Sequence, residues 1–287
     1  MRNSPLIIPA MQNMLKRVFI YMLLIGGIFF VVGPLLWMVS SSLKDIRDVF
    51  AVPPKLIPNP AIWQNYLEAW SKANFPLYFA NSIFVAVVVT FGQLATGALA
   101  AFAFARIEFR GKNILFYLVL GTLMIPSEML LVPNYVILKQ LGWLNTRYAL
   151  TIPLMAGALA IFLLRQQFMT IPRELEDAAT IDGCSRLRFF WSIVLPNSKP
   201  ALSVVTVFTF ITNWNSYIWP LIVTRDDNLR TIQVGLSAFK DAQSYGANTE
   251  WHLLMAASVL ALLPVLLIYL CAERWFTQGF LFSGIRG

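Results

Sequence analysis

The sequence has little of what metal and disulfide chemistry require. It contains two cysteines and one histidine among 287 residues. Cys184 lies in a charged loop and Cys271 in the last apolar run, so the pair is not placed to form a structural disulfide. His252 has no cluster of cysteine or histidine beside it, which leaves a transition metal without its usual ligands. We therefore expect no metal or other cofactor bound by the chain itself.

A phosphate-binding loop is also missing. The Gly111-Lys112 pair is followed by Asn113, and Arg106 occupies the position where such a loop has its earlier glycine. Carboxylates gather between Glu174 and Asp182, but the exposed start of a helix accounts for them and no nucleophile or metal constellation accompanies them. We expect that the chain is not an enzyme.

Charge is scarce and apolar residues are abundant. Charged residues make up 13% of the chain and hydrophobic residues 58%, with a mean hydropathy of +0.66. Long uncharged runs of this kind predict an all-α polytopic membrane protein with six transmembrane helices in a single domain, 1–287. The third run is short before Glu128, so that span has to continue past it or tilt. The expected spans are about 18–41, 78–105, 113–133, 148–168, 200–224 and 253–273.

The basic residues that produce the net charge of +8 lie in particular short loops and not on one stripe. This distribution favours membrane orientation over nucleic-acid binding, because cytoplasmic loops are enriched in lysine and arginine. The segment before the first span, the turn 106–112 and the loop 165–199 are the most densely basic. We expect these segments and both termini to be cytoplasmic.

Small residues recur every four positions in the second expected span. Gly97, Ala101 and Ala105 therefore lie on one face of a helix. Such a face lets a second helix approach closely, so the spacing predicts tight helix packing there.

The loop 170–198 predicts a helix, a glycine turn and a second helix. Pro172 suits a first helical turn, acids follow it as the helix dipole favours, and Gly183 supplies a stop. Ser185 suits the start of a second short helix that reaches about Trp191, and Pro196 discourages its continuation. By periodicity alone, this segment is equally consistent with a solvated connector and with a docking element.

The same loop carries a recognisable spacing. Asp177-Ala178-Ala179 is followed by three residues, Gly183, nine residues, and then Ile193, one residue and Leu195-Pro196. This pattern resembles the cytoplasmic signature of binding-protein-dependent ABC import permeases, in which glutamate stands where this chain has Asp177. The resemblance implies a coupling helix between the fourth and fifth spans, seated on an ATPase subunit. The implied ATPase-coupling residues are Glu174, Asp177, Ala178, Ala179, Asp182 and Gly183.

Two further stretches are similar to the carbohydrate-type branch of these permeases. The fifth expected span carries Asn213, Trp214, Asn215, Tyr217 and Trp219. Amides and aromatic faces of this kind bind sugars, which makes these residues a candidate substrate path, although the same side chains bond neighbouring helices equally well. The resemblance also implies that the tail, Gly284, Ile285, Arg286 and Gly287, contacts the ATPase dimer.

The resemblance implies a permease subunit in a bacterial inner membrane that imports a sugar, an oligosaccharide, or a related polyol or glycerol phosphate. Its expected partners are a homologous second permease, two ATPase subunits that carry ATP and magnesium, an extracytoplasmic solute-binding protein and the lipid bilayer. Two alternatives remain open: an ion-coupled secondary transporter and a non-transporting scaffold or signalling subunit. The first requires a functional buried carboxylate, and Glu128 stands alone near the end of its span.

Overall fold

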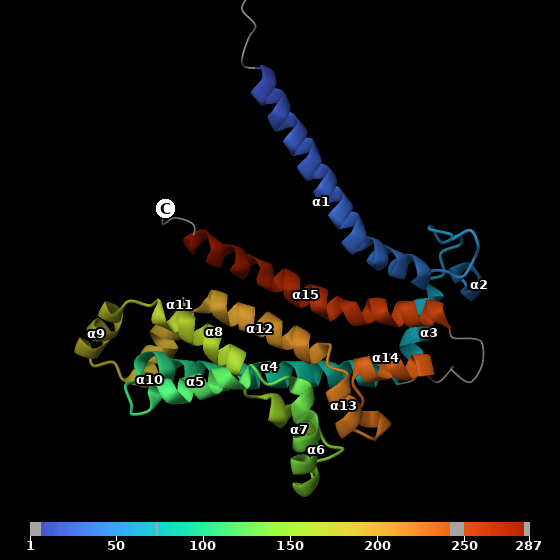
Figure 1. Cartoon of the computed structure of the whole chain (residues 1–287). Coiled ribbons are helices and arrows are strands. Elements are labelled where there is room, and N and C mark those ends of the chain that lie inside the picture. Colours follow the sequence, from blue (N-terminus) through green and yellow to red (C-terminus); the bar gives the residue numbers. More distant parts are fainter. Residues whose placement is uncertain (1–6, 73, 242–249, 284–287) are drawn as a thin grey trace, which may run out of the picture. The chain divides into compact units, whose positions relative to one another are not determined.

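The computed structural model describes residues 7–72, 74–241 and 250–283, and every regular element in those ranges is helical. This confirms the all-α fold class. The helices, labelled in Figure 1, are α1 (Ile7–Ser42), α2 (Ile46–Val49), α3 (Gln64–Ser71), α4 (Phe75–Arg106), α5 (Lys112–Thr122), η1 (Ser127–Leu130), α6 (Leu131–Gln140), α7 (Arg147–Thr151), η2 (Ile152–Leu154), α8 (Ala158–Met169), α9 (Arg173–Ile181), α10 (Arg186–Phe189), the π-helix η3 (Phe190–Val194), α11 (Leu195–Asn197), α12 (Lys199–Trp214), α13 (Ile218–Val223), η4 (Asp227–Leu229), α14 (Ile232–Asp241) and α15 (Trp251–Ser283).

Four stretches are long and apolar enough to cross a membrane by themselves, namely Lys16–Ser42, Phe75–Arg106, Arg147–Met169 and Trp251–Glu273. Two further pairs of helices pass the same criterion only together, because each pair is sharply bent. The described residues thus contain four spans, or six if each bent pair crosses the membrane as one.

The third expected span is not one continuous helix. α5 ends at Thr122, and the segment Ser127–Gln140 leaves it at an angle of 95°. Pro126, with φ −57° and ψ 135°, is extended, and a proline also turns the preceding residue away from helical geometry. Glu128 lies beyond this break, where Ser127 Oγ donates to its carboxylate at 3.0 Å.

The region 186–224 also differs from the expectation. The helix that begins at Arg186 continues beyond the expected end near Trp191, through a π turn to Asn197, one residue past Pro196, and meets α12 at 78°. A wider π turn directly before a proline leaves room for its ring, which supplies a reason for the continuation. The expected fifth span is interrupted between Trp214 and Ile218, because Pro220 fits the first turn of a new helix, where no intrahelical donor is needed.

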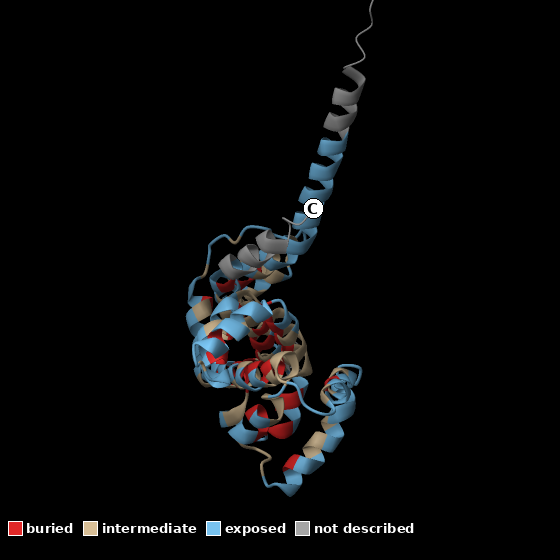
Figure 2. Ribbon diagram, turned by 90° about the vertical axis from the view of Figure 1, so that its left-hand side faces the viewer, coloured by how far each residue is buried: buried red, intermediate tan, exposed pale blue. Residues whose placement is uncertain are grey.

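The chain divides into two compact units, residues 1–72 with 242–260 and residues 73–241 with 261–287. In the first unit, the described side chains of α1 are largely exposed, as Figure 2 shows. Asn65 of α3 is buried there, and its side-chain amide donates to the carbonyls of Ser42 and Lys44 at 2.9 Å each. These bonds fix α3 to the last residue of α1 and to the turn that follows it.

The second unit is built around α4, which packs against α8 and α12 (Figure 1). A Cβ added to Gly97 would lie 3.1 Å from the Cβ of Ala160, and Ala101 is fully buried. The predicted close approach along the small-residue face is therefore confirmed, with α8 as the partner. Larger apolar side chains, among them Phe102, Leu164 and Val205, complete this core.

Candidate functional site

α9 forms where the sequence places its start and stop signals. Pro172 precedes the helix with φ −56° and ψ 141°, and Glu174 and Glu176 lie in its first turn. Carboxylates at this end offset the positive pole of the helix dipole. The acidic start therefore stabilises α9 without any ligand.

A glycine-terminated motif ends α9. Gly183 has φ +74°, the amide of Cys184 donates to Ala179 O at 2.8 Å, and the amide of Gly183 donates to Thr180 O at 3.0 Å. This pair of bonds defines a Schellman motif, which satisfies the last carbonyls of the helix and reverses the chain. Ser185 then caps α10 by accepting a hydrogen bond from the amide of Arg188 at 3.3 Å. The predicted glycine turn and serine cap are both present.

The two alanines of the motif face different surroundings. Ala179 is 8% exposed and belongs to the core that includes Phe168 and Phe189. Ala178 is exposed, and so is Ile181, at 87%. The small side chain of Ala179 lets α9 pack closely against the core of its own unit. The small side chain of Ala178 leaves a shallow surface beside the exposed Ile181.

Most carboxylates of the motif are exposed to solvent. Glu174, Asp177 and Asp182 are exposed, and within the described residues none of them has an ion pair or a hydrogen bond to its side chain. Glu176 is the exception, since it is partly buried and paired with Arg106. The outward face of α9 is therefore acidic and unpartnered inside this chain.

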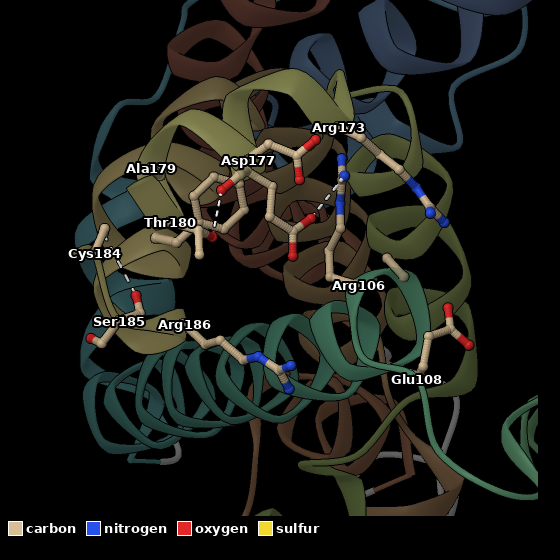
Figure 3. A pocket seen from close by; sticks show the side chains of 12 residues that line it. Arg106, Glu108, Arg173, Asp177, Ala179, Thr180, Cys184, Ser185 and Arg186 are labelled. Carbon is tan, nitrogen blue, oxygen red and sulfur yellow. Dashed lines mark hydrogen bonds and ion pairs between the residues drawn. The ribbon is translucent and has the colours of Figure 1, made fainter. Parts of the chain in front are cut away.

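A hollow of about 460 Å³ lies between α9, α10 and the end of α4 (Figure 3). Its wall combines three arginines with three carboxylates and small residues. The lining side chains are Ala105, Arg106, Glu108, Arg173, Glu176, Asp177, Ala179, Thr180, Cys184, Ser185, Arg186 and Phe189. Two of the expected coupling residues, Asp177 and Ala179, thus line the same hollow as Glu108 in the turn that follows α4. Glu176, beside them on α9, lines it too.

Arg106, the last residue of α4, is the member of this site that sequence reasoning missed. Its side chain is 5% exposed and its Nη1 lies 3.3 Å from Glu176 Oε2. Its Nη2 donates to Phe168 O at 2.6 Å and also to Ile171 O. In the sequence, Arg106 counts only as one of several basic residues beside a span, because its acceptors lie more than 60 residues away along the chain.

The candidate substrate path separates into inward and outward side chains. Trp214 is 1% exposed and donates through Nε1 to Ala261 O at 3.0 Å, while Trp219 donates to Ala149 O at the same distance. Asn213 donates to Thr209 O at 2.8 Å. Asn215 and Tyr217 are exposed at the interruption between α12 and α13.

Among the described residues, no group of three or more His, Cys, Asp or Glu side chains is placed to hold a metal ion. The expected tail contact, Gly284 to Gly287, lies outside the described residues.

Comparison with known proteins identifies the family. Residues 93–281 match the model of the family described as binding-protein-dependent transport system inner membrane component. The chain belongs to this family. It is a permease subunit of a binding-protein-dependent ABC transport system, as the resemblance around Asp177 predicts, and a multi-pass membrane protein, as the long apolar runs predict.

Curated relatives cover almost the whole chain. The sn-glycerol-3-phosphate transport system permease protein UgpE of Yersinia enterocolitica is 40% identical over 269 residues, which are 91% of this chain and 95% of the relative. UgpE of Pectobacterium atrosepticum is 39% identical, and UgpE of Salmonella typhi is 38% identical, with the same coverage.

The fold matches solved transporters as well. A crystal structure of a bacterial ABC transporter that imports the acidic polysaccharide alginate superposes with a TM-score of 0.83, at 22% identity, over 96% of this chain and 99% of the other. A chain of an alginate ABC transporter complexed with an alginate pentasaccharide-bound periplasmic protein gives a TM-score of 0.67 at 12% identity, over 94% and 96%. At these identities the likeness establishes the fold alone.

Proposed function

We propose that this permease subunit imports sn-glycerol 3-phosphate or a related polyol phosphate or sugar, which it receives from an extracytoplasmic solute-binding protein. A homologous second permease completes the pathway, and two separate ATPase subunits drive it. The relatives named for sn-glycerol-3-phosphate transport, at about 40% identity over most of the chain, support the substrate class. The alginate transporters support the architecture and not the substrate.

The outward face of α9 carries this proposal. It presents Asp177, Ala178 and Asp182, exposed and unpartnered within the described chain, on a helix that the Gly183 motif holds at a defined angle. An acidic patch with a small side chain at its centre fits a basic rim around a shallow groove. We assign that groove to an ATPase subunit, with Glu174 beside it.

Energy input then occurs on the partners. ATP and magnesium bind the ATPase subunits, and closure of those subunits displaces α9. This chain supplies no phosphate cradle, so its contribution is mechanical. The shorter side chain of Asp177, in place of the family's glutamate, withdraws the carboxylate by about one methylene and weakens the pairing without abolishing it.

The location of α9 follows from the charge distribution. We assign both termini, the turn 106–112 and the segment 170–198 to the cytoplasmic side of the inner membrane, because these segments are rich in arginine and lysine. The tail 284–287 then lies on the side of the ATPases. On the outward side of the same unit, the exposed Asn215 and Tyr217 contribute to the substrate path.

Reconstitution of the full complex in vesicles tests this function. We expect uptake of labelled sn-glycerol 3-phosphate only with ATP inside and the binding protein outside, and we expect Asp177→Lys to reduce recovery of the ATPase with the permease. Glu128→Gln serves as the control, since Glu128 lies beyond the break after α5. Uptake driven by a proton gradient without ATP would instead identify an ion-coupled transporter, and intact assembly without any uptake would identify a scaffold.

A further inference from the structure

We propose that Arg106 is a positioning residue that joins α9 to α4 and α8, so that these three helices move together when an ATPase displaces α9. The inference rests on the proposed function and assigns a role to a residue outside the motif around Asp177. Its basis is one buried guanidinium that bonds to three segments of the chain; Figure 3 shows its contact with a carboxylate of α9.

The position of Arg106 makes its burial unusual. A cation in the last turn of an apolar helix ordinarily extends toward water, because a buried charge is costly unless it is paired and hydrogen-bonded. Arg106 is 5% exposed and turns back into the fold. The buried guanidinium is therefore stable only while the acceptors around it stay in place.

The acceptors bracket the connection between α8 and α9. Phe168 O lies in the last turn of α8 and Ile171 O in the short connector, while Glu176 lies on α9. Phe168 O also accepts a hydrogen bond from the amide of Ile171 at 3.4 Å, and Arg106 adds a donor with the sign of charge that the carboxyl end of a helix favours. Because Arg106 binds residues on both sides of the connector, α9 cannot swing on that connector without breaking a charged hydrogen bond.

Packing supports the same link. Phe168 and Ala179, from α8 and α9, share a buried core with Phe102 of α4. This contact resists separation but permits sliding, because apolar packing has no fixed direction. The planar guanidinium adds direction, since its two Nη nitrogens reach separate acceptors in a fixed fork that a lysine ammonium does not reproduce.

Arg165 provides a matched control. It also joins α8 to α4, because its Nε donates to Phe104 O at 3.2 Å, and its guanidinium lies 4.0 Å from the ring centroid of Phe116 on α5. No hydrogen bond or ion pair connects Arg165 to α9 within the described residues. Arg165→Lys therefore makes the same chemical change between the same two helices without touching the link to α9.

The experiment measures uptake and ATP hydrolysis together in vesicles that contain the whole complex. We expect Glu176→Gln and Arg106→Lys each to lower substrate taken up per ATP hydrolysed by about tenfold, the scale of one lost charged hydrogen bond, with the complex assembled. The double variant Arg106→Lys/Glu176→Gln should fall no further than the worse single variant, because both changes break one contact. Arg165→Lys should keep the native ratio.

Glu176→Gln is the milder change, since Glu176 is partly exposed, and it keeps the test decisive if Arg106→Lys fails to assemble. A native ratio in assembled Glu176→Gln would overturn the proposal, as would a parallel fall of uptake and hydrolysis or an equal loss in Arg165→Lys. These outcomes differ from failure of the proposed function, in which the native complex itself shows no ATP-dependent uptake.

Discussion

Gly183 offers a perturbation whose cost is confined to the backbone. Its φ of +74° lies in the left-handed region, and a Cβ added there would meet no atom within 4 Å. Gly183→Ala therefore introduces no clash, and its only cost is the strain of an alanine in the left-handed conformation, about 1–2 kcal/mol. If the segment relieves this strain by opening, it gives up the bonds from Cys184 to Ala179 and from Gly183 to Thr180.

A penalty of this size lowers the ratio of bent to open conformer by about 5- to 30-fold. Because an ATPase that needs the bend binds only the bent conformer, we expect its affinity for Gly183→Ala to fall by up to the same factor. Gly183→Asn should lose less, since asparagine tolerates the left-handed region better than alanine. The measurement is a titration of immobilised permease complex, held in lipid nanodiscs, with the purified ATPase.

Gly142→Ala is the control for this titration. Gly142 has φ +68° and equal space for a Cβ, but it lies between α6 and α7. The variant Gly142→Ala introduces the same backbone strain at a distance from α9, so the permease that carries it should bind the ATPase with native affinity. Equal losses in Gly142→Ala and Gly183→Ala, or native binding in Gly183→Ala, would refute the reasoning.

Two further predictions concern other parts of the second unit. Trp214→Phe removes the donor to Ala261 O and should lower the free energy of unfolding by about 1–3 kcal/mol. Asn215→Ala, a change at the exposed neighbouring residue, should raise the KM of uptake and leave thermal unfolding unchanged. The opposite pattern would contradict the assignment. Hydrogen bonds from Tyr78, and then from Asn74, hold the pKa of the Asp227 carboxyl below its usual value. A depressed pKa stabilises the fold above the unfolded-state pKa of about 3.9, and this stabilisation is lost as the pH falls through the folded-state pKa. Hydrogen exchange in the loop 225–231, corrected for its intrinsic rate, should therefore accelerate only at such acidic pH. The variant Asp227→Asn should show no such acceleration.

The parts of the site that the sequence predicts depend on short-range signals. The Gly183 motif and the Ser185 cap involve residues at most five positions apart. The small-residue face of α4 follows from helical spacing alone, and packing against Ala160 confirms it. Such features are readable because local geometry and side-chain size decide them before any tertiary contact forms.

The features that sequence reasoning missed depend on distant contacts or on helix rotation. Arg106 finds its acceptors only when α8 and α9 fold against α4, so no local pattern marks it. Trp214 and Trp219 turn inward while Asn215 and Tyr217 stay exposed, and position along an apolar run does not reveal that difference. The break near Pro126 had a local signal, but the apolar run before Glu128 is too short to cross a bilayer, and that length requirement favoured one span continuing past it.

α4 connects the ends of the second unit with an uninterrupted helix. At its start, Tyr78 OH donates to Asp227 Oδ1 at 2.7 Å and Asn81 Nδ2 donates to Asn228 O at 2.8 Å, which fixes the loop 225–231 to it. At its end, Arg106 holds α8 and α9. Its 32 residues extend about 48 Å and contain proline only in the first turn, whereas α15 has Pro264 in its interior. Since sharp bends form mainly at interior prolines and similar defects, we expect α4 to transmit a displacement that begins at α9 and the loop 225–231 to follow it.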